Sequence, residues 1–247
     1  MAPIAAQDNI LRYLVPKRTI HEMVRLGPRE DGGYVVPRFA LDRCSCLFSY
    51  GIGNEYRAEL EFIQRYQKPI YSFDHTITDW ALPREINHTS EGLGFGEGCR
   101  DFVEHCRQHQ ISMGAFAKID VEGYEYEYFL NVDIDTFADI AIGLCLEVHW
   151  LHHPEIQKCF IDMMKVLERN YTLVHTHANN WGEKFTYDHY EIYNVYELTF
   201  LHKRYVKQIA EITDSYPLQN LDYPNNPYLP DYDFPFFKDE RLVAQRY

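Results

Sequence analysis

The sequence predicts an α/β fold in which a mainly parallel central sheet has an antiparallel edge. Short apolar runs alternate with segments of helical periodicity along most of the chain, which is the pattern of βαβ units and a parallel sheet. A strand, a glycine turn and a helix follow one another near residue 50. The last two apolar runs, residues 171–176 and 195–201, are joined by a hairpin-like link, which favours antiparallel pairing at the edge.

The individual elements follow from the apolar runs and their boundaries. Residues 141–149 form a nearly continuous apolar run, as expected for a strand that is covered on both faces. Residues 154–170 are amphipathic and begin with Pro154, a residue type favoured at the first position of a helix. The expected strands are residues 46–50, 69–73, 115–120, 141–149, 171–176 and 195–201, and the expected helices are residues 55–66, a segment that ends near 108, one that begins near 124, and 154–170.

The length of 247 residues suits one large α/β domain with additions at both ends. We expect residues 1–26 to form an N-terminal helical extension and residues 27–203 to form the domain itself. Residues 204–247 are expected to form an irregular C-terminal segment that packs on the domain. Its stretch 217–237 is rich in proline, tyrosine, asparagine and aspartate, and its aromatic side chains suit packing against the core better than a lid over a pocket.

The formal net charge of −13 disfavours partners that need a basic surface, namely nucleic acids and anionic membranes. No run approaches the ~18 consecutive apolar residues that a membrane-spanning helix needs, and residues 1–10 lack the basic and apolar blocks of a secretory signal. The six cysteines include no C-x-x-C pair. These features predict a protein of the reducing cytoplasm with no membrane span.

The glycine turn is the first candidate for a cofactor site. Gly51 and Gly53 follow the first expected strand, and Asp74 ends the second. Such a turn exposes backbone N–H groups to a cofactor, and an acidic residue about 20 positions later can bind the hydroxyls of a ribose. A nicotinamide dinucleotide site would normally carry a third glycine, where this chain has Arg57 and Ala58. On its own, the pattern is also that of a structural turn with a capping aspartate.

Further motifs follow one another along the chain. In order they are D-G-G-Y at 31–34, S-Y-G-I-G-N at 49–54, F-D-H at 73–75, K-I-D-V-E-G at 118–123, L-E-V-H at 146–149, H-T-H-A-N-N at 175–180 and E-L-T-F at 197–200. This ordered set resembles the FkbM methyltransferase family over roughly residues 26–203. The resemblance implies a Rossmann-like class I methyltransferase fold and S-adenosylmethionine as the methyl donor. Members of the family usually methylate hydroxyl oxygens, often those of sugars.

The resemblance also implies cofactor contacts, residue by residue. Gly51 and Gly53 match the cofactor turn, and Asp74 matches the ribose-binding acid. Tyr50 stands where many methyltransferases carry an acidic residue, which is a departure from the usual pattern. The residues expected to bind the cofactor are Asp31, Gly32, Gly33, Tyr34, Tyr50, Gly51, Gly53, Asp74, His75 and Asp120.

Methylation of a sugar hydroxyl requires a group that takes the hydroxyl proton. His149 is the first candidate for this base and His177 the second, with the catalytic carboxylates Asp120 and Glu122 at the exit of a neighbouring strand. Such positions at strand ends suit the crevice outside the carboxyl edge of an α/β sheet. A divalent metal such as Mg²⁺ or Mn²⁺ is an alternative way to lower the pKa of the hydroxyl, with Asp120, Glu147 and His149 as its ligands.

The predicted function is therefore O-methylation of a sugar hydroxyl, on a glycan or a glycosylated small molecule. Methylation of protein or RNA is the nearest alternative, and the acidic charge disfavours RNA. A Rossmann-like binding module without catalysis is a further alternative, against which the presence of Asp74, Asp120 and Glu122 argues. A nucleotide-sugar dehydrogenase or epimerase would carry a Tyr-x-x-x-Lys pair, and the sequence has none in a suitable place.

Overall fold

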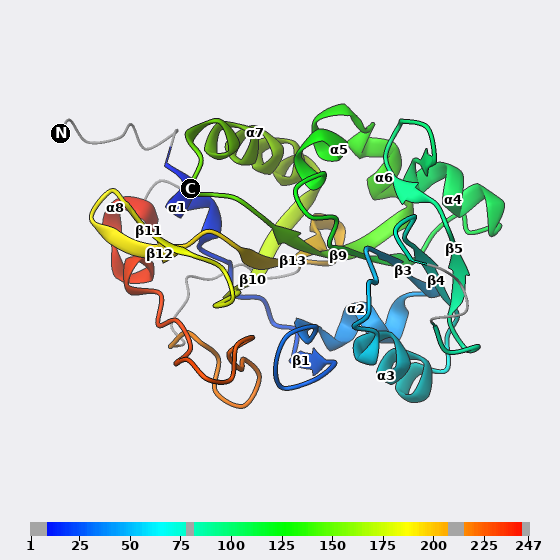
Figure 1. Cartoon of the computed structure of the whole chain (residues 1–247), viewed down its shortest axis with the longest axis horizontal. Coiled ribbons are helices and arrows are strands. Elements are labelled where there is room, and N and C mark those ends of the chain that lie inside the picture. Colours follow the sequence, from blue (N-terminus) through cyan, green and yellow to red (C-terminus); the bar gives the residue numbers. More distant parts are fainter. Residues whose placement is uncertain (1–8, 78–81, 207–214, 244–247) are drawn as a thin grey trace.

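The computed structural model describes residues 9–77, 82–206 and 215–243. Its central sheet consists of seven strands: β3 (Cys46–Tyr50), β4 (Ile70–Phe73), β5 (Asn87–Thr89), β8 (Ala115–Ile119), β9 (Ala141–Val148), β10 (Tyr171–Ala178) and β13 (Tyr196–His202). Their order across the sheet is β10-β13-β9-β8-β3-β4-β5 (Figure 1). The strands from β9 to β5 run parallel, whereas β13 is antiparallel to both β9 and β10. The predicted mainly parallel sheet with an antiparallel edge is confirmed.

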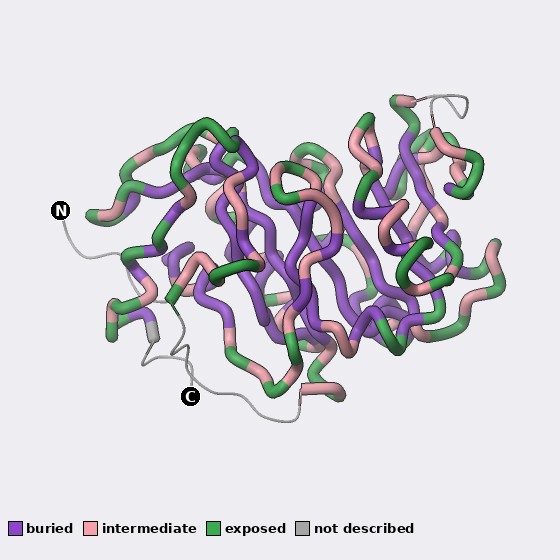
Figure 2. The backbone as a smooth tube through the Cα atoms, turned by 90° about the horizontal axis from the view of Figure 1, so that it is seen from below, coloured by how far each residue is buried: buried purple, intermediate pink, exposed green. Residues whose placement is uncertain are grey.

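Helices cover both faces of this sheet (Figure 1). On one face lie α4 (Phe102–Gln108), α5 (Glu125–Asn131), α6 (Ile134–Ile140) and α7 (Pro154–Asn170), and on the other lie α2 (Arg38–Arg43) and α3 (Arg57–Tyr66). Every residue of β3, β8, β9 and β10 is buried, and Figure 2 shows the buried chain at the centre of the molecule. This double cover explains the continuous apolar runs in the sequence. Among the described residues, no helix is both long and apolar enough to cross a membrane.

Small sheets stand beside the central one. They pair β1 (Met23–Leu26) with β2 (Tyr34–Pro37), β6 (Gly92–Leu93) with β7 (Cys99–Arg100), and β11 (Lys184–Tyr187) with β12 (Tyr190–Tyr193). The predicted N-terminal helical extension is helical in α1 (Ile10–Leu14), but residues 15–22 are not helical and residues 23–26 form a strand. Residues 1–8 of this prediction lie outside the described residues. Val24 and Leu26 are buried on one face of β1, and the backbone of β1 forms antiparallel hydrogen bonds with β2.

Residues 204–206 and 215–243 of the C-terminal segment are described. Its regular elements are the end of the 3₁₀ helix η3 (Lys203–Tyr205), the 3₁₀ helix η4 (Pro235–Lys238) and the short helix α8 (Glu240–Val243). Tyr232, Phe234 and Phe236 are buried in the main core cluster, and the Tyr232 hydroxyl donates to the carbonyl oxygen of Glu191 on the β11–β12 hairpin. Aromatic side chains therefore attach this segment to the domain. The domain boundaries at residues 26 and 203 stay predictions.

The buried aromatics of the C-terminal segment should contribute strongly to stability. Phe236 is 0% exposed, whereas Tyr228 in the same segment is 88% exposed. We expect Phe236→Ala to lower the free energy of unfolding by about 3–5 kcal/mol, because it leaves a cavity in the core. Tyr228→Ala is the matched control and should change it by less than about 0.5 kcal/mol. Urea unfolding of both variants checks this, and equal small effects would contradict the role given to the segment.

Candidate active site

A cleft of 860 Å³ opens at the carboxyl edge of the central sheet. Gly51, Asp74, Asp120 and His149 lie on its wall, each directly after one of the strands β3, β4, β8 and β9. Because these strands run parallel, residues far apart in the chain meet at one edge. The other sequence-predicted residues that line the cleft are Asp31, Gly32, Tyr34, Gly53, Glu122 and Glu147.

The turn after β3 brings the backbone to the surface of the cleft. Gly51 has a φ of +70°, and a Cβ atom there would lie 1.5 Å from the carbonyl oxygen of Asp120, so that only glycine fits. Gly53 has a φ of +51°, and a Cβ atom on it would have no neighbour within 4 Å. The backbone at Gly53 therefore borders open space, which suits the close approach of a ligand.

Asp74 is buried beside this turn. Its carboxylate accepts hydrogen bonds from the backbone N–H of Gly53 at 3.1 Å and from the backbone N–H and hydroxyl of Thr76 at 2.8 and 2.6 Å. Burial alone would raise the pKa of Asp74, but these hydrogen bonds lower it below its ordinary value. The group is a carboxylate at neutral pH and keeps lone pairs for hydroxyl donors. Asp74 also lines a second cavity of 470 Å³, whose wall includes His75 and Phe95.

His149 is held in place by a buried carboxylate. Its Nδ1 lies 3.3 Å from Oε1 of Glu125, which also accepts the backbone N–H of His149 at 3.0 Å. This contact favours the tautomer with the proton on Nδ1, which leaves Nε2 as the proton acceptor. Nε2 lies 3.5 Å from Oε2 of Glu122 and 3.8 Å from Oδ1 of Asp120. The accepting nitrogen is thus on the side of the two cleft carboxylates.

The surrounding carboxylates set the basicity of His149. Burial alone would lower the pKa of this histidine, but the hydrogen bond to Glu125 and the charges of Asp120 and Glu122 outweigh burial and raise the pKa above its ordinary value. The same charges stabilise the imidazolium that forms when Nε2 takes a proton. The arrangement therefore suits general-base chemistry.

Asp120, Glu122 and His149 also form a set that could hold a divalent metal. One ligand atom from each lies within 4.8 Å of the other two. Carboxylates and imidazole together are ligands for Mn²⁺ and similar ions, and carboxylates alone suit Mg²⁺. The sequence suggested Glu147 as a ligand in place of Glu122. In the structure the three ligand atoms that lie together come from Asp120, Glu122 and His149, whereas Oε1 of Glu147 accepts a hydrogen bond from Asn179 at 2.8 Å.

Comparison with known proteins decides the family. The family model described as the methyltransferase FkbM domain matches residues 22–173, more than half of the chain. The chain belongs to the FkbM methyltransferase family. The resemblance seen in the motifs is thereby confirmed. The chain is a methyltransferase with a Rossmann-like class I fold, and its family implies that S-adenosylmethionine is the methyl donor. No curated protein sequence matches the chain.

Solved structures similar to this FkbM protein also include methyltransferases. One is precorrin-6y C5,15-methyltransferase from Geobacter metallireducens GS-15, with 11% sequence identity, a TM-score of 0.35, and coverage of 66% of this chain and 84% of that one. Another is a provisionally assigned tRNA (m1A22) methyltransferase, Sp1610 from Streptococcus pneumoniae. It has 8% sequence identity and a TM-score of 0.31, and the match covers 66% of this chain and 68% of that one.

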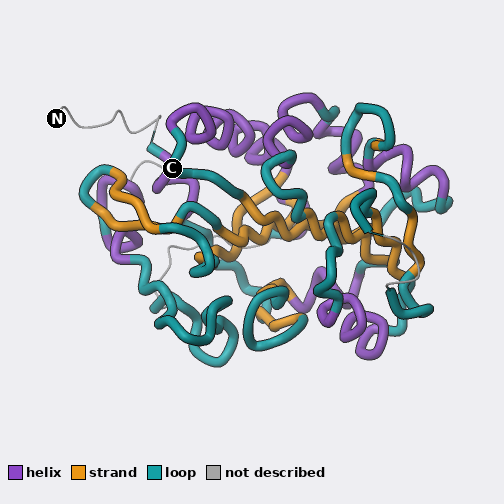
Figure 3. The backbone as a smooth tube through the Cα atoms, viewed as in Figure 1, coloured by secondary structure: helices purple, strands orange, loops and turns teal. Residues whose placement is uncertain are grey.

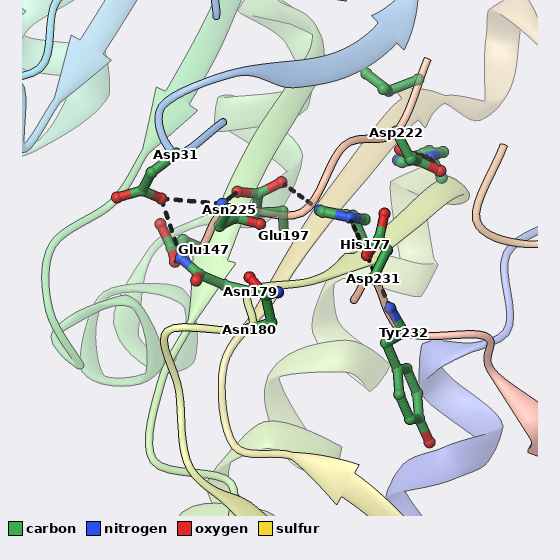
Figure 4. Close-up of polar contacts among 12 residues, drawn as sticks. Asp31, Glu147, His177, Asn179, Asn180, Glu197, Asp222, Asn225, Asp231 and Tyr232 are labelled. Atoms are coloured by element: carbon green, nitrogen blue, oxygen red, sulfur yellow. Dashed lines mark hydrogen bonds and ion pairs between the residues drawn. The ribbon is translucent and has the colours of Figure 1, made fainter. Parts of the chain in front are cut away.

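Three carboxylates of the FkbM protein, of which Glu147 and Glu197 are buried, are tied together by two amides (Figure 4). Nδ2 of Asn179 donates to Asp31 at 3.2 Å and to Glu147 at 2.8 Å. Nδ2 of Asn225 donates to the same Asp31 oxygen at 2.9 Å and to Glu197 at 2.6 Å. Partial desolvation of its carboxylate raises the pKa of Asp31, and burial together with neighbouring carboxylates raises the pKa of Glu147 well above its usual range. The inner wall of the cleft therefore favours a ligand group that carries positive charge.

His177, the second predicted base, belongs to this network and is not among the residues that line the cleft. It is buried on β10, 3.2 Å from Glu197 and 3.0 Å from Asp231 of the C-terminal segment (Figure 4). Burial alone would lower the pKa of His177, but these two carboxylates raise it to about 10. A histidine that keeps its proton at neutral pH suits attachment of the C-terminal segment to the sheet better than acceptance of a substrate proton.

Three other predicted cofactor residues lie behind or beside the cleft. Tyr50 is fully buried, and its hydroxyl pairs with Nδ1 of His105 at 3.2 Å, so that it supports β3 from within the core. A Cβ atom at Gly33 would lie 2.1 Å from the carbonyl oxygen of Pro28, so that this glycine allows a close backbone approach. His75 lines the second cavity. Of the three, only His75 borders space for a ligand.

Sequence reasoning missed several residues of the site. Lys118 belongs to the K-I-D-V-E-G motif and donates to the carbonyl oxygen of Gly51 at 3.1 Å. Trp150 directly follows the L-E-V-H motif and lines the cleft. These two could have been found from their motifs. Glu125 and Trp181 could not, because their importance comes from what the fold places beside them.

Proposed function

We propose that this FkbM protein methylates a sugar hydroxyl, with His149 as the base that takes the hydroxyl proton. The observation that carries the proposal is the pairing of His149 with buried Glu125, which directs Nε2 to the cleft carboxylates. A sugar hydroxyl is too weakly acidic to ionise unaided at neutral pH, so that its methylation needs such a base.

The residues of the cleft fit S-adenosylmethionine. The open space beside Gly53 admits a ligand close to the backbone, and the carboxylate of Asp74 suits the two hydroxyls of a ribose. The adjoining cavity beside Phe95 suits a flat aromatic base. Asp31 and Glu147 favour cationic groups, such as a sulfonium or an ammonium. When bound, the cofactor supplies an electrophilic methyl group.

The residues of the chain then act on the acceptor. The acceptor oxygen gains the methyl carbon as the carbon–sulfur bond breaks, and the hydroxyl proton passes to Nε2 of His149. Glu125 on Nδ1 orients the ring, and Asp120 beside Nε2 stabilises the imidazolium until its proton returns to water. No further acid is needed, because the leaving group is a neutral thioether.

A metal-assisted route would use the same residues. With Mg²⁺ or Mn²⁺ on Asp120, Glu122 and His149, the metal would lower the pKa of the hydroxyl and replace the base. Loss of activity in EDTA, followed by recovery with either ion, would assign this route. Undiminished activity in EDTA supports His149 as the base.

Transfer of a labelled methyl group from S-adenosylmethionine to methyl glycosides tests the substrate class. Methylation of at least one glycoside, with release of S-adenosylhomocysteine, is the expected result. Methylation of protein or RNA alone would overturn the sugar assignment. We place the reaction in the cytoplasm, since all six cysteines are free thiols, as suits a reducing compartment.

Asp74 provides the test of the cofactor site. We expect Asp74→Ala to weaken S-adenosylmethionine binding by roughly tenfold to a few hundredfold, since two hydrogen bonds to a charged group are lost with partial replacement by water. Calorimetric titration measures this. Asp133→Ala is the control, because Asp133 caps α6 and lies outside the cleft. Unchanged affinity in Asp74→Ala would show that the ribose lies elsewhere.

A further inference from the structure

We infer that the acceptor is a neutral or positively charged sugar that stacks on Trp150 and Trp181 in the cleft. The inference rests on the proposed function and names the class of hydroxyl compound that the cleft accepts.

Trp150 and Trp181 both line the cleft and are 45% and 58% exposed. Such large aromatic side chains usually gain stability from burial, so that their exposure on the wall of a cleft marks a binding surface. Trp150 also has a φ of +64°, a conformation that bulky residues rarely adopt and that persists where the surroundings enforce it. Its ring centroid lies 6.4 Å from that of His149, so that a ring stacked on Trp150 lies beside the base.

Asn194 joins the two turns that carry these tryptophans. Its Nδ2 contacts Nδ1 of His152 at 2.9 Å, and its Oδ1 accepts the backbone N–H of Glu183 at 2.8 Å. Its carbonyl oxygen accepts the backbone N–H of Leu151 at 3.0 Å. Asn194 is buried, so that these bonds are shielded from water. In the second turn, Oδ1 of Asn179 accepts a hydrogen bond from the backbone N–H of Trp181 at 3.0 Å.

The backbone of both turns is therefore held in place before any ligand arrives, which lowers the entropy cost of binding. An indole face is a flat apolar surface, and the C–H face of a pyranose is the matching flat surface of an otherwise polar molecule. Hydroxyl groups at the rim of such a ring remain free to meet His149. Two exposed aromatic surfaces in one cleft, one of them beside the base, thus suit a sugar better than a flexible peptide.

The charges in the half of the cleft that is lined by Trp150 and Trp181 disfavour the binding of anions. Its acidic side chains include Glu122 and Glu183, and among the described residues that line the cleft the sole Lys or Arg is Lys118. Lys118 is on the cofactor side, where it donates to the carbonyl oxygen of Gly51. Phosphate and carboxylate groups are normally bound by Arg or Lys. A nucleotide sugar or a uronic acid would meet carboxylates here, whereas an amino sugar would be attracted.

A matched panel of acceptors tests the charge class. The methyl glycosides of glucose, galactose, mannose, glucosamine and glucuronic acid, together with UDP-glucose, are compared with labelled S-adenosylmethionine. We expect kcat/KM to be higher for the neutral and amino sugars than for the two anionic acceptors. If sugars are methylated but an anionic acceptor is preferred, this inference is overturned while the proposed function stands. Methylation of no sugar would overturn the proposed function, and this inference with it.

Two variants test the residues on the best acceptor. Trp181→Ala should raise the acceptor KM roughly 5- to 30-fold, as for an aromatic side chain that the ligand covers, with cofactor affinity unchanged and with recovery in Trp181→Phe. Glu183→Lys should improve kcat/KM for the glucuronide roughly fivefold at low salt, and less at high salt. Glu155→Lys is the control, because its exposed side chain lies outside the cleft. An unchanged acceptor KM in Trp181→Ala would contradict the inference that the sugar stacks on Trp181.

Discussion

His149→Ala should lower kcat by about 10²–10⁴-fold while leaving the affinity for S-adenosylmethionine nearly unchanged. The loss comes from the missing proton acceptor and not from collapse of the site. Glu125 keeps its hydrogen bonds from the backbone N–H groups of Gly123 at 2.9 Å and of residue 149 at 3.0 Å, so that it is not left without a partner. Steady-state kinetics and calorimetry measure the two effects separately.

The control for this variant is His153→Ala. His153 is half exposed, directly precedes α7 and lies outside the cleft, so that its removal should leave kcat unchanged. The pH profile gives a second readout. Because the pKa of His149 is raised, kcat of the wild type should still rise with pH above about 6.5, the ordinary value for histidine. A rise in acceptor KM alone, with kcat unchanged, would make His149 a positioning residue.

Gly51→Ala should abolish cofactor binding and lower the free energy of unfolding by at least about 3 kcal/mol. The left-handed backbone alone costs a non-glycine residue ~1–2 kcal/mol. In addition, the new Cβ atom would lie 1.5 Å from a backbone oxygen of Asp120, so that either β3 or β8 must move. Thermal or urea unfolding and calorimetric titration of S-adenosylhomocysteine measure the two effects.

Gly53→Ala separates the steric effect from the conformational one. Gly53 has a similar φ of +51°, but its Cβ atom would meet nothing within 4 Å. This variant should lose only ~1–2 kcal/mol of stability. It should nevertheless weaken cofactor binding, because the methyl group enters the space that we assign to the cofactor. Equal destabilisation by the two variants, or unchanged binding in Gly53→Ala, would contradict this account of the turn.

The sequence could predict the parts of the site that follow strands. Gly51, Asp74, Asp120 and His149 each lie directly after an apolar run, and parallel strands bring such positions to one edge of the sheet. Short local patterns therefore sufficed for six of the seven strands of the central sheet and for these four residues. They did not suffice for β5 (Asn87–Thr89), which has only three residues, or for residues 23–26, whose alternating burial is too short to distinguish a strand from a helix.

Contacts between distant segments could not be predicted. Asn225 donates to Asp31 although nearly the whole domain separates them in sequence, and nothing local to either residue signals the pairing. The same holds for His177, which was expected in the cleft because it lies near a strand end. Its partners Glu197 and Asp231 come from a neighbouring strand and the C-terminal segment, and only the fold brings these three groups together.

The order of the sheet has a consequence for synthesis on the ribosome. β13 lies between β9 and β10 although it follows both in the chain, and the family match already ends at residue 173. β10 therefore leaves the ribosome before the strand that must join it to the sheet. Until residue 202 has emerged, the edges of β9 and β10 have unpaired backbone groups, which are sites for aggregation or chaperone binding. The nascent chain is thus most prone to aggregation just before β13 is complete. The central sheet can finish folding only when the C-terminal third of the chain has been made.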